Sequence, residues 1–217
     1  MTDLNQNKID HYFKLKTEIK KNNSNFMIVS KNRTQEEIIP YIKLGHKIFG
    51  ENRVIEANKK FTRIKNIFDL NEIELHLIGL LQSNKVKLAL QTFDVIQTID
   101  RKKLIDVISK EKLNNPSLKT KSFFIQVNIG NEPQKTGIRY EDTLELYEYA
   151  LISNIKIDGL MCIPPNDNYT EKYFQKMNLL RERIGNNLLL SMGMSNDYEL
   201  ALKHGTNLVR LGSKIFN

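Results

Sequence analysis

The sequence predicts an α/β fold, a (β/α)8 TIM-type barrel in a single domain over residues 1–217, with an extra N-terminal helix. Two observations support this prediction. Eight short apolar runs alternate with helical patterns, which is typical of parallel sheets built from βαβ units. Polar and glycine-rich clusters follow these runs, and a barrel brings the carboxyl ends of its strands to one face. The length of 217 residues is at the short end of the range for such barrels.

The strands are predicted from apolar runs that end at polar residues, glycine or proline. These runs lie at 26–30, 46–49, 74–79, 94–99, 122–129, 156–163, 188–192 and 207–211. A doubly wound open sheet is the alternative arrangement. It is disfavoured because no Gly-x-Gly-x-x-Gly motif follows the first run.

The helices are predicted at 4–22, 35–44, 53–60, 101–113, 141–153, 169–184 and 196–204, with one more that ends near Leu90. Thr34, with Glu37 three residues later, fits a capping box at a helix start. Gly45 fits the position just after a helix end. These signals make the helix between the first two strands the best defined of the set.

Charge and hydropathy limit the function classes. The net charge of +8 favours anionic partners. The basic residues are spread along the chain, and no aromatic stacking motif accompanies them, so nucleic-acid binding is disfavoured. No apolar run is long enough to span a bilayer. The Lys-rich segment 1–21 is not a signal peptide. We expect a cytoplasmic protein that does not bind membranes.

The cysteine and histidine content predicts neither a disulfide nor a metal site. Cys162 is the single cysteine, and it lies in the apolar run 159–163, where a thiol behaves as a small hydrophobe. The four histidines are scattered without metal-ligand spacing.

Lys31 is the sharpest candidate for chemistry. It follows the first apolar run, which places it near the mouth of the predicted barrel. In a semi-buried site, desolvation favours the neutral amine, the form that condenses with carbonyl compounds. The alternative is a lysine that extends from a strand end into solvent.

The segments after the last two predicted strands form a candidate phosphate site. They read Ser191-Met192-Gly193-Met194-Ser195 and Arg210-Leu211-Gly212-Ser213. Barrels commonly bind phosphate there, because glycine allows close approach and backbone N–H groups donate to the anion. Two ordinary turns are the alternative. A buried Arg210 needs a partner, either a protein carboxylate in a structural ion pair or a ring nitrogen of a cofactor.

Several motifs in one order resemble a known family, from about residue 4 to the end of the chain. The chain resembles the pyridoxal phosphate homeostasis proteins, also called the YggS or PROSC family, which are similar to the N-terminal barrel of alanine racemase. The motifs are Val29-Ser30-Lys31, Phe49-Gly50-Glu51-Asn52, His76-Leu77-Ile78-Gly79-x-Leu81-Gln82-Ser83-Asn84-Lys85, Gln126-Val127-Asn128 with Lys135-x-Gly137, Gly159-Leu160-Met161, Ser191-Met192-Gly193-Met194-Ser195-x-Asp197-Tyr198 and Val209-Arg210-x-Gly212.

The resemblance implies a cofactor, pyridoxal 5′-phosphate, and a role for each site residue. Lys31 would hold the cofactor aldehyde as a Schiff base, and Arg210 would face the pyridine nitrogen. The pocket near the ring would be lined by Asn52 and His76. The phosphate would be held by Met194, Ser195, Gly212 and Ser213. An arginine opposite the ring nitrogen disfavours its protonation, because two positive charges would lie close together.

The resemblance also implies a function without robust catalysis. The protein would hold the cofactor for intracellular homeostasis and deliver it to apo-enzymes, as a monomer. The alternative is a weak amino-acid racemase, which needs a second base on the other face of the substrate. Tyr41, Tyr140, Tyr169 and Tyr198 are the tyrosines near predicted loops or helix starts, and none belongs to a base motif. The sequence departs from the family at Leu80, where His or Pro is common, and at Ser213, which keeps a hydroxyl group.

Overall fold

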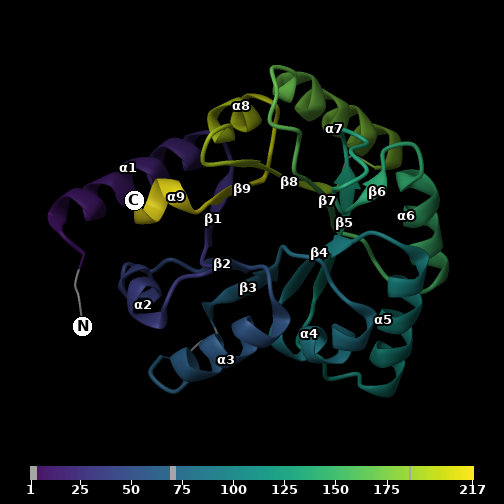
Figure 1. Ribbon diagram of the computed structural model, residues 1–217, viewed down its shortest axis with the longest axis horizontal. Coiled ribbons are helices and arrows are strands. Elements are labelled where there is room, and N and C mark those ends of the chain that lie inside the picture. Colours follow the sequence, from purple (N-terminus) through teal and green to yellow (C-terminus); the bar gives the residue numbers. More distant parts are fainter. Residues whose placement is uncertain (1–3, 69–71, 186) are drawn as a thin grey trace.

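The structure is a computed structural model that describes residues 4–68, 72–185 and 187–217. Eight parallel strands form a closed barrel surrounded by helices (Figure 1), which confirms the predicted fold class. The strand order is β4-β3-β2-β1-β9-β8-β7-β5, and the β4–β5 pairing closes the ring. These strands are β1 (Asn25–Val29), β2 (Ile48–Glu51), β3 (Glu74–Leu77), β4 (Val95–Ile99), β5 (Ser122–Asn128), β7 (Gly159–Cys162), β8 (Leu189–Met194) and β9 (Leu208–Leu211).

The predicted start of β7 is three residues too early, and β2 and β8 each extend two residues beyond their predicted ends, through a glycine. At Gly50, an added Cβ atom would lie 2.2 Å from the Met27 sulfur, so a larger residue here would require the Met27 side chain on the neighbouring strand β1 to move. At Gly193 the φ angle is +94°, and β8 continues to Met194. A pattern that treats glycine as the end of a strand stops too early at both places.

In the part of the chain that the structure describes, eight helices surround the barrel, and a ninth follows the last strand. They are α1 (Gln6–Lys21), α2 (Gln35–Lys43), α3 (Val54–Lys65), α4 (Val86–Thr92), α5 (Lys102–Asn114), α6 (Thr143–Ile152), α7 (Thr170–Ile184), α8 (Tyr198–Lys203) and α9 (Ser213–Phe216). The sequence did not predict three short elements: α9, the 3-10 turn η2 (Ser83–Lys85), and β6 (Ile138–Arg139), which pairs with β5 outside the ring.

The capping signals around α2 are confirmed. The Thr34 side chain accepts from the Glu37 backbone N–H, and the Glu37 carboxylate accepts from the Thr34 N–H at 2.8 Å. Gly45 follows the helix with a φ angle of +77°, a conformation that glycine adopts without strain. The helix that follows the Lys31 turn therefore begins and ends at fixed residues.

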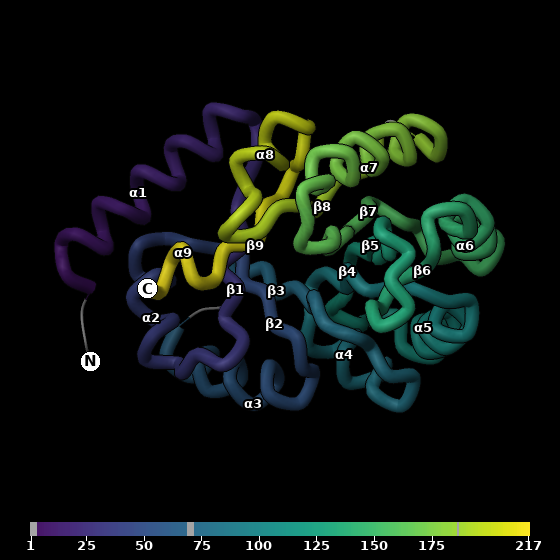
Figure 2. Tube along the Cα trace, turned by 45° about the horizontal axis from the view of Figure 1, so that its top comes forward, coloured from purple at the N-terminus to yellow at the C-terminus, as the bar shows by residue number. Residues whose placement is uncertain are grey.

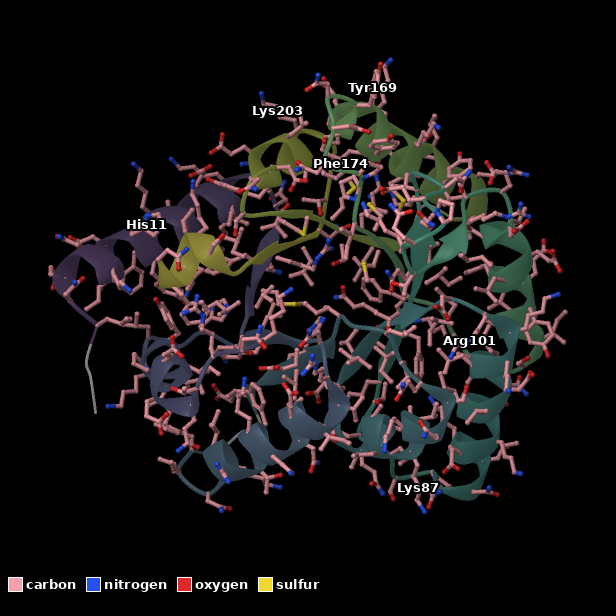
Figure 3. The ribbon with its side chains drawn as sticks, in the orientation of Figure 1. His11, Lys87, Arg101, Tyr169, Phe174 and Lys203 are labelled. Atoms are coloured by element: carbon pink, nitrogen blue, oxygen red, sulfur yellow. The ribbon has the colours of Figure 1, made fainter. Side chains whose placement is uncertain are left out.

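Alternating side chains divide each strand between two packed regions. On β3, Leu75 and Leu77 belong to the apolar layer under the helices, whereas His76 points into the barrel. Hydrogen bonds between strands that are not neighbours identify other interior residues, such as Gln97 on β4 and Ser191 on β8. Figure 3 shows the helical layer from the barrel end, with the buried Phe174 on the inner side of α7 and Lys203 on the outer rim.

The predicted N-terminal helix is α1, which lies beside the end of the chain (Figures 1 and 2). Lys8 Nζ donates to the Phe216 carbonyl oxygen at 2.8 Å, and His11 Nε2 lies 2.8 Å from the Lys214 carbonyl oxygen. The helix thus holds α9, which directly follows the last barrel strand. No helix among the described residues is both long and apolar enough to cross a bilayer.

Candidate functional site

A cavity of about 280 Å³ opens at the carboxyl end of the barrel strands. Seven of the eight predicted site residues line it: Lys31, Asn52, Met194, Ser195, Arg210, Gly212 and Ser213. Its other lining residues are Val29, Ile78, Ile163 and Asn196. Polar groups thus converge from several strands on one partly apolar pocket, as predicted for the catalytic face of a barrel.

Strand order explains why these residues meet. The neighbouring strands β2, β1, β9 and β8 end beside one another at the cavity. Arg210 pairs with Met27 on β1 and with Met194 on β8, and the β8–β9 register shifts between Ser191 and Met194. The side walls formed by Ile78 and Ile163 follow β3 and β7, respectively.

Lys31 lies in the turn after β1, two residues beyond the end of the strand at Val29. Its side chain is exposed, which differs from the semi-buried position that the sequence predicts. The reason is the turn itself, because Asn32 has a φ angle of +59° and the backbone leaves the barrel there. Among the described residues, no carboxylate forms an ion pair with Lys31, and Lys31 lines the cavity.

Backbone N–H groups gather where the phosphate was predicted. The Ser195 hydroxyl oxygen accepts hydrogen bonds from the backbone N–H groups of Gly212 and Lys214, both at 3.3 Å. The loop that carries Ser195 is held by Asp197, whose carboxylate accepts from the Met194 N–H at 2.5 Å. Two N–H donors aimed at one oxygen atom match what a phosphate oxygen needs.

Gly212 provides a test of whether a ligand fits there. A Cβ atom added at Gly212 would meet nothing closer than the Val29 Cβ atom, at 3.6 Å. This is ordinary van der Waals contact, so packing within the protein does not require glycine at this position. Space for a group in the cavity does explain it, and the residues present therefore fit a phosphate.

Arg210 forms the floor of the cavity and is only 3% exposed. Its Nη1 atom donates to the Ser191 carbonyl oxygen at 2.7 Å, and Nη2 donates to the Cys162 carbonyl oxygen at 2.7 Å. Burial lowers the pKa of Arg210, but an arginine side chain still remains a cation. Within the described residues no carboxylate lies within ion-pair distance, so the structural ion pair considered above is not formed.

Asn52 and His76 do not share one position, although the resemblance places both near the ring. Asn52 lines the cavity, and its Oδ1 atom is buried without a hydrogen-bond partner among the described residues. Such an orphaned acceptor fits a ligand that donates a hydrogen bond. His76 does not line the cavity. It lies deeper in the barrel, between Glu74 and Gln97.

Sequence reasoning missed four lining residues: Val29, Ile78, Ile163 and Asn196. Each lies directly beside a residue of a motif quoted above or just after a strand, but one-residue offsets at strand ends are not resolved by patterns. Leu80, the departure from the family, lines a neighbouring cavity of about 560 Å³ that meets the first at Asn52. This departure from the family therefore changes the neighbouring cavity and not the lining of the first.

Two further predicted features have structural roles. Burial raises the pKa of the Cys162 thiol to about 12, so the thiol stays protonated at neutral pH. Asn128 closes the loop before β6, since its side chain bonds the backbone of Glu132 in both directions at 2.8 and 3.1 Å. In the described part of the chain, no group of three or more His, Cys, Asp or Glu side chains could hold a metal ion.

Comparisons with known proteins agree with this geometry, although no family model matches the chain. The pyridoxal phosphate homeostasis protein of Aquifex aeolicus is 38% identical over 196 residues, which cover 86% of this chain and 83% of that protein. The protein of the same name from Haemophilus influenzae is 35% identical over 218 residues, 94% and 90% of the two chains. PipY of Synechococcus elongatus, solved with pyridoxal phosphate bound, has a TM-score of 0.83 at 28% identity and covers 97% of this chain and 100% of its own. Alanine racemase of Bartonella henselae shares the fold, with a TM-score of 0.74 at 12% identity over 94% of this chain and 56% of its own.

Proposed function

The chain belongs to the pyridoxal phosphate homeostasis protein family, and on that premise we propose that it binds pyridoxal 5′-phosphate as a Schiff base on Lys31. One observation carries the proposal: a single cavity is lined by an exposed lysine, a buried arginine and Ser195, whose hydroxyl oxygen accepts from two backbone N–H groups. Bound pyridoxal phosphate supplies an aldehyde that condenses reversibly with primary amines.

Each part of the proposed site has a separate task. Lys31 provides the amine that holds the aldehyde carbon. The N–H groups of Gly212 and Lys214, with the Ser195 hydroxyl, are the donors for the phosphate, and Met194 and Ser213 border them. Arg210 presents a fixed positive charge to the pyridine nitrogen and disfavours its protonation. Asn52 offers its unpaired Oδ1 atom to the ring substituents.

We propose that the protein holds and delivers the cofactor rather than catalysing a reaction with it. Lys31 is exposed, so an amine from another protein can reach the same aldehyde. Racemisation, the alternative, needs a second base beside the cofactor. In the described part of the chain no tyrosine lines the cavity; Tyr41 donates to the Ile215 carbonyl oxygen at 2.9 Å, and Tyr198 lies 3.3 Å from Glu18. A cytoplasmic location, a monomeric state and transfer to apo-enzymes stay predictions.

Reductive trapping tests the proposal directly. The protein is incubated with pyridoxal phosphate and reduced with borohydride, and the labelled peptide is identified by mass spectrometry. We expect the label on Lys31 and its loss in Lys31→Ala and Lys31→Arg, the second of which keeps the positive charge. Lys85→Ala is the matched control, because Lys85 lines only the neighbouring cavity. A label on another lysine, or an undiminished label in both Lys31 variants, would refute the assignment.

Transfer is tested separately with an apo-enzyme that regains activity on receiving the cofactor. The loaded protein and the same amount of free pyridoxal phosphate are compared in the presence of a scavenger for the free aldehyde. Delivery predicts that reactivation by the loaded protein resists the scavenger. Equal sensitivity of both sources would mean that the protein merely releases the cofactor into solution.

A further inference from the structure

A row of hydrogen bonds crosses the interior of the barrel and ends at the floor of the cavity. Glu74 Oε1 lies 2.5 Å from His76 Nε2, and Gln97 Nε2 lies 2.8 Å from His76 Nδ1. The Ser191 hydroxyl is 2.8 Å from Gln97 Oε1, and Arg210 Nη1 donates to the same hydroxyl oxygen at 3.0 Å. Five side chains from β3, β4, β8 and β9 are therefore linked without a gap.

The donors in this row all point the same way. An ionised Glu74 can only accept, so His76 carries its proton on Nε2 and accepts at Nδ1. Gln97 must then present its NH2 group to His76 and its oxygen to Ser191. The Ser191 hydroxyl donates to that oxygen, which leaves its lone pair for Arg210, a group that can only donate. The row runs from a cation to an anion with every dipole aligned.

The two ends of the row have contrasting surroundings. Arg210 is buried, and its acceptors among the described residues are two carbonyl oxygens and the Ser191 hydroxyl. Glu74 begins β3 at the amino end of the barrel, and half of its side chain is exposed. The hydrogen bond from His76 is the main reason that the pKa of Glu74 is lowered, and Lys121 adds to the effect.

We propose that Glu74 is a positioning residue for the cofactor site, acting through His76, Gln97 and Ser191 as the remote counter-charge of Arg210. The aligned row holds Nη1 of Arg210 in place and reduces the positive field that the guanidinium presents at the cavity. The part of this inference that concerns the cofactor rests on the proposed function. The alternative is that the five side chains only fill the barrel interior and satisfy one another locally.

A thermodynamic cycle on the cofactor-free protein tests the coupling. Glu74→Gln removes the charge at one end and keeps an acceptor, and Arg210→Met removes the cation at the other. For uncoupled distant sites, the two changes in the unfolding equilibrium constant multiply to within about twofold. We expect a deviation of about fivefold or more. The control cycle replaces Glu74→Gln by Gln126→Leu, because Gln126 is a buried interior glutamine that bonds Thr136 outside the row. A multiplicative result for Glu74 and Arg210 would overturn the inference.

A second measurement covers the case in which Arg210→Met does not fold. The ring-nitrogen NMR shifts of the wild-type histidines report the tautomer of His76, with Gln97→Leu used to assign it. The inference requires a protonated Nε2 and an unprotonated Nδ1 that responds to Gln97→Leu. A proton on Nδ1 would reverse the row at its first link and overturn the inference.

A third measurement tests the effect on the cofactor site. It follows the visible absorption band of the protein with pyridoxal phosphate bound and the pH at which this band titrates. Glu74→Gln leaves a more positive site, so the titration midpoint should fall by about 0.5 pH unit or more, while Gln126→Leu should not move it. An unchanged midpoint in Glu74→Gln, with a coupled cycle, would refute the transmission to the cavity. If the wild type shows no band, the proposed function fails, and the cycle still decides whether the row couples its ends.

Discussion

The Lys60 ammonium group donates to the backbone carbonyl oxygen of Ser30 at 2.8 Å, one residue before Lys31. The same Nζ atom lies 2.8 Å from Glu51 Oε1, which also accepts from the Ser30 hydroxyl at 2.7 Å. Lys60 is 15% exposed and Glu51 is 1% exposed, so this ion pair is buried. A helix on the outside of the barrel thus fixes the backbone that carries the proposed Schiff-base lysine.

Lys60→Met should destabilise the protein by about 3–5 kcal/mol, because it leaves the Glu51 carboxylate buried without its cation. Urea unfolding measures this loss. The rate of borohydride trapping at Lys31 should also fall, since Ser30 loses its tether. The double variant Lys60→Met, Glu51→Gln is the control and should recover part of the stability. A loss below about 1 kcal/mol in the single variant would contradict the buried pair.

Gly212→Ala should weaken pyridoxal phosphate binding by about tenfold without changing the thermal midpoint of unfolding. The added methyl group meets Val29 only at ordinary contact distance, but it takes space in the proposed phosphate position. Pyridoxal, which lacks the phosphate, is the matched ligand and should bind both proteins alike. Equal losses for the two ligands would place the phosphate elsewhere.

Acid should destabilise the protein through His46. Burial lowers the pKa of His46 to about 4, and the nearby positive charge of Lys16 adds to the effect, while the hydrogen bond between Nε2 and the Ile48 carbonyl oxygen opposes it. The unfolded chain binds the proton more tightly, so the stability present above about pH 6.5 is lost as the pH falls toward 4. The full contribution is about 3 kcal/mol. Unfolding free energies measured from pH 7 to 4 should show this slope, and His46→Gln, which cannot be protonated, should reduce it.

Racemisation of free amino acids should not exceed that catalysed by pyridoxal phosphate alone. The cavity offers Lys31 as its one candidate base in the described part of the chain, and a racemase needs a base on each face. Exchange of the Cα proton in deuterated water, followed by NMR for alanine and serine, measures this sensitively. Exchange accompanied by formation of the opposite enantiomer in wild type, measured by chiral chromatography and lost in Lys31→Ala, would instead favour the racemase alternative.

The sequence predicted the barrel because each βα unit carries its own local signals, as the capping box at Thr34 and Glu37 shows. It also placed seven of the eight candidate site residues on one cavity, since positions after strand ends converge in this fold. Elements such as β6 and α9 were missed because two to four residues are too short to show a period.

The partners of Arg210 could not be predicted for a different reason. Two of them are the backbone carbonyl oxygens of Cys162 and Ser191, and every residue type has such an oxygen. The sequence also could not predict how deep His76 lies in the barrel. The alternation of side chains along the strand predicts that His76 faces inward. Its distance from the barrel mouth depends on the stagger between strands, which no local sequence pattern encodes.

The Ser195 hydroxyl oxygen already sits where the N–H groups of Gly212 and Lys214 converge. In the proposed site, a phosphate that binds these donors would displace the hydroxyl from them, and the hydroxyl would return when the phosphate leaves. Neither N–H group is then left without an acceptor. A buried N–H group without one would cost about 1–3 kcal/mol. The Ser195 hydroxyl oxygen can thus replace a phosphate oxygen as the acceptor of both N–H groups, so release of the phosphate exchanges one acceptor for another. For the proposed delivery role, this exchange keeps the free-energy cost of releasing the cofactor low.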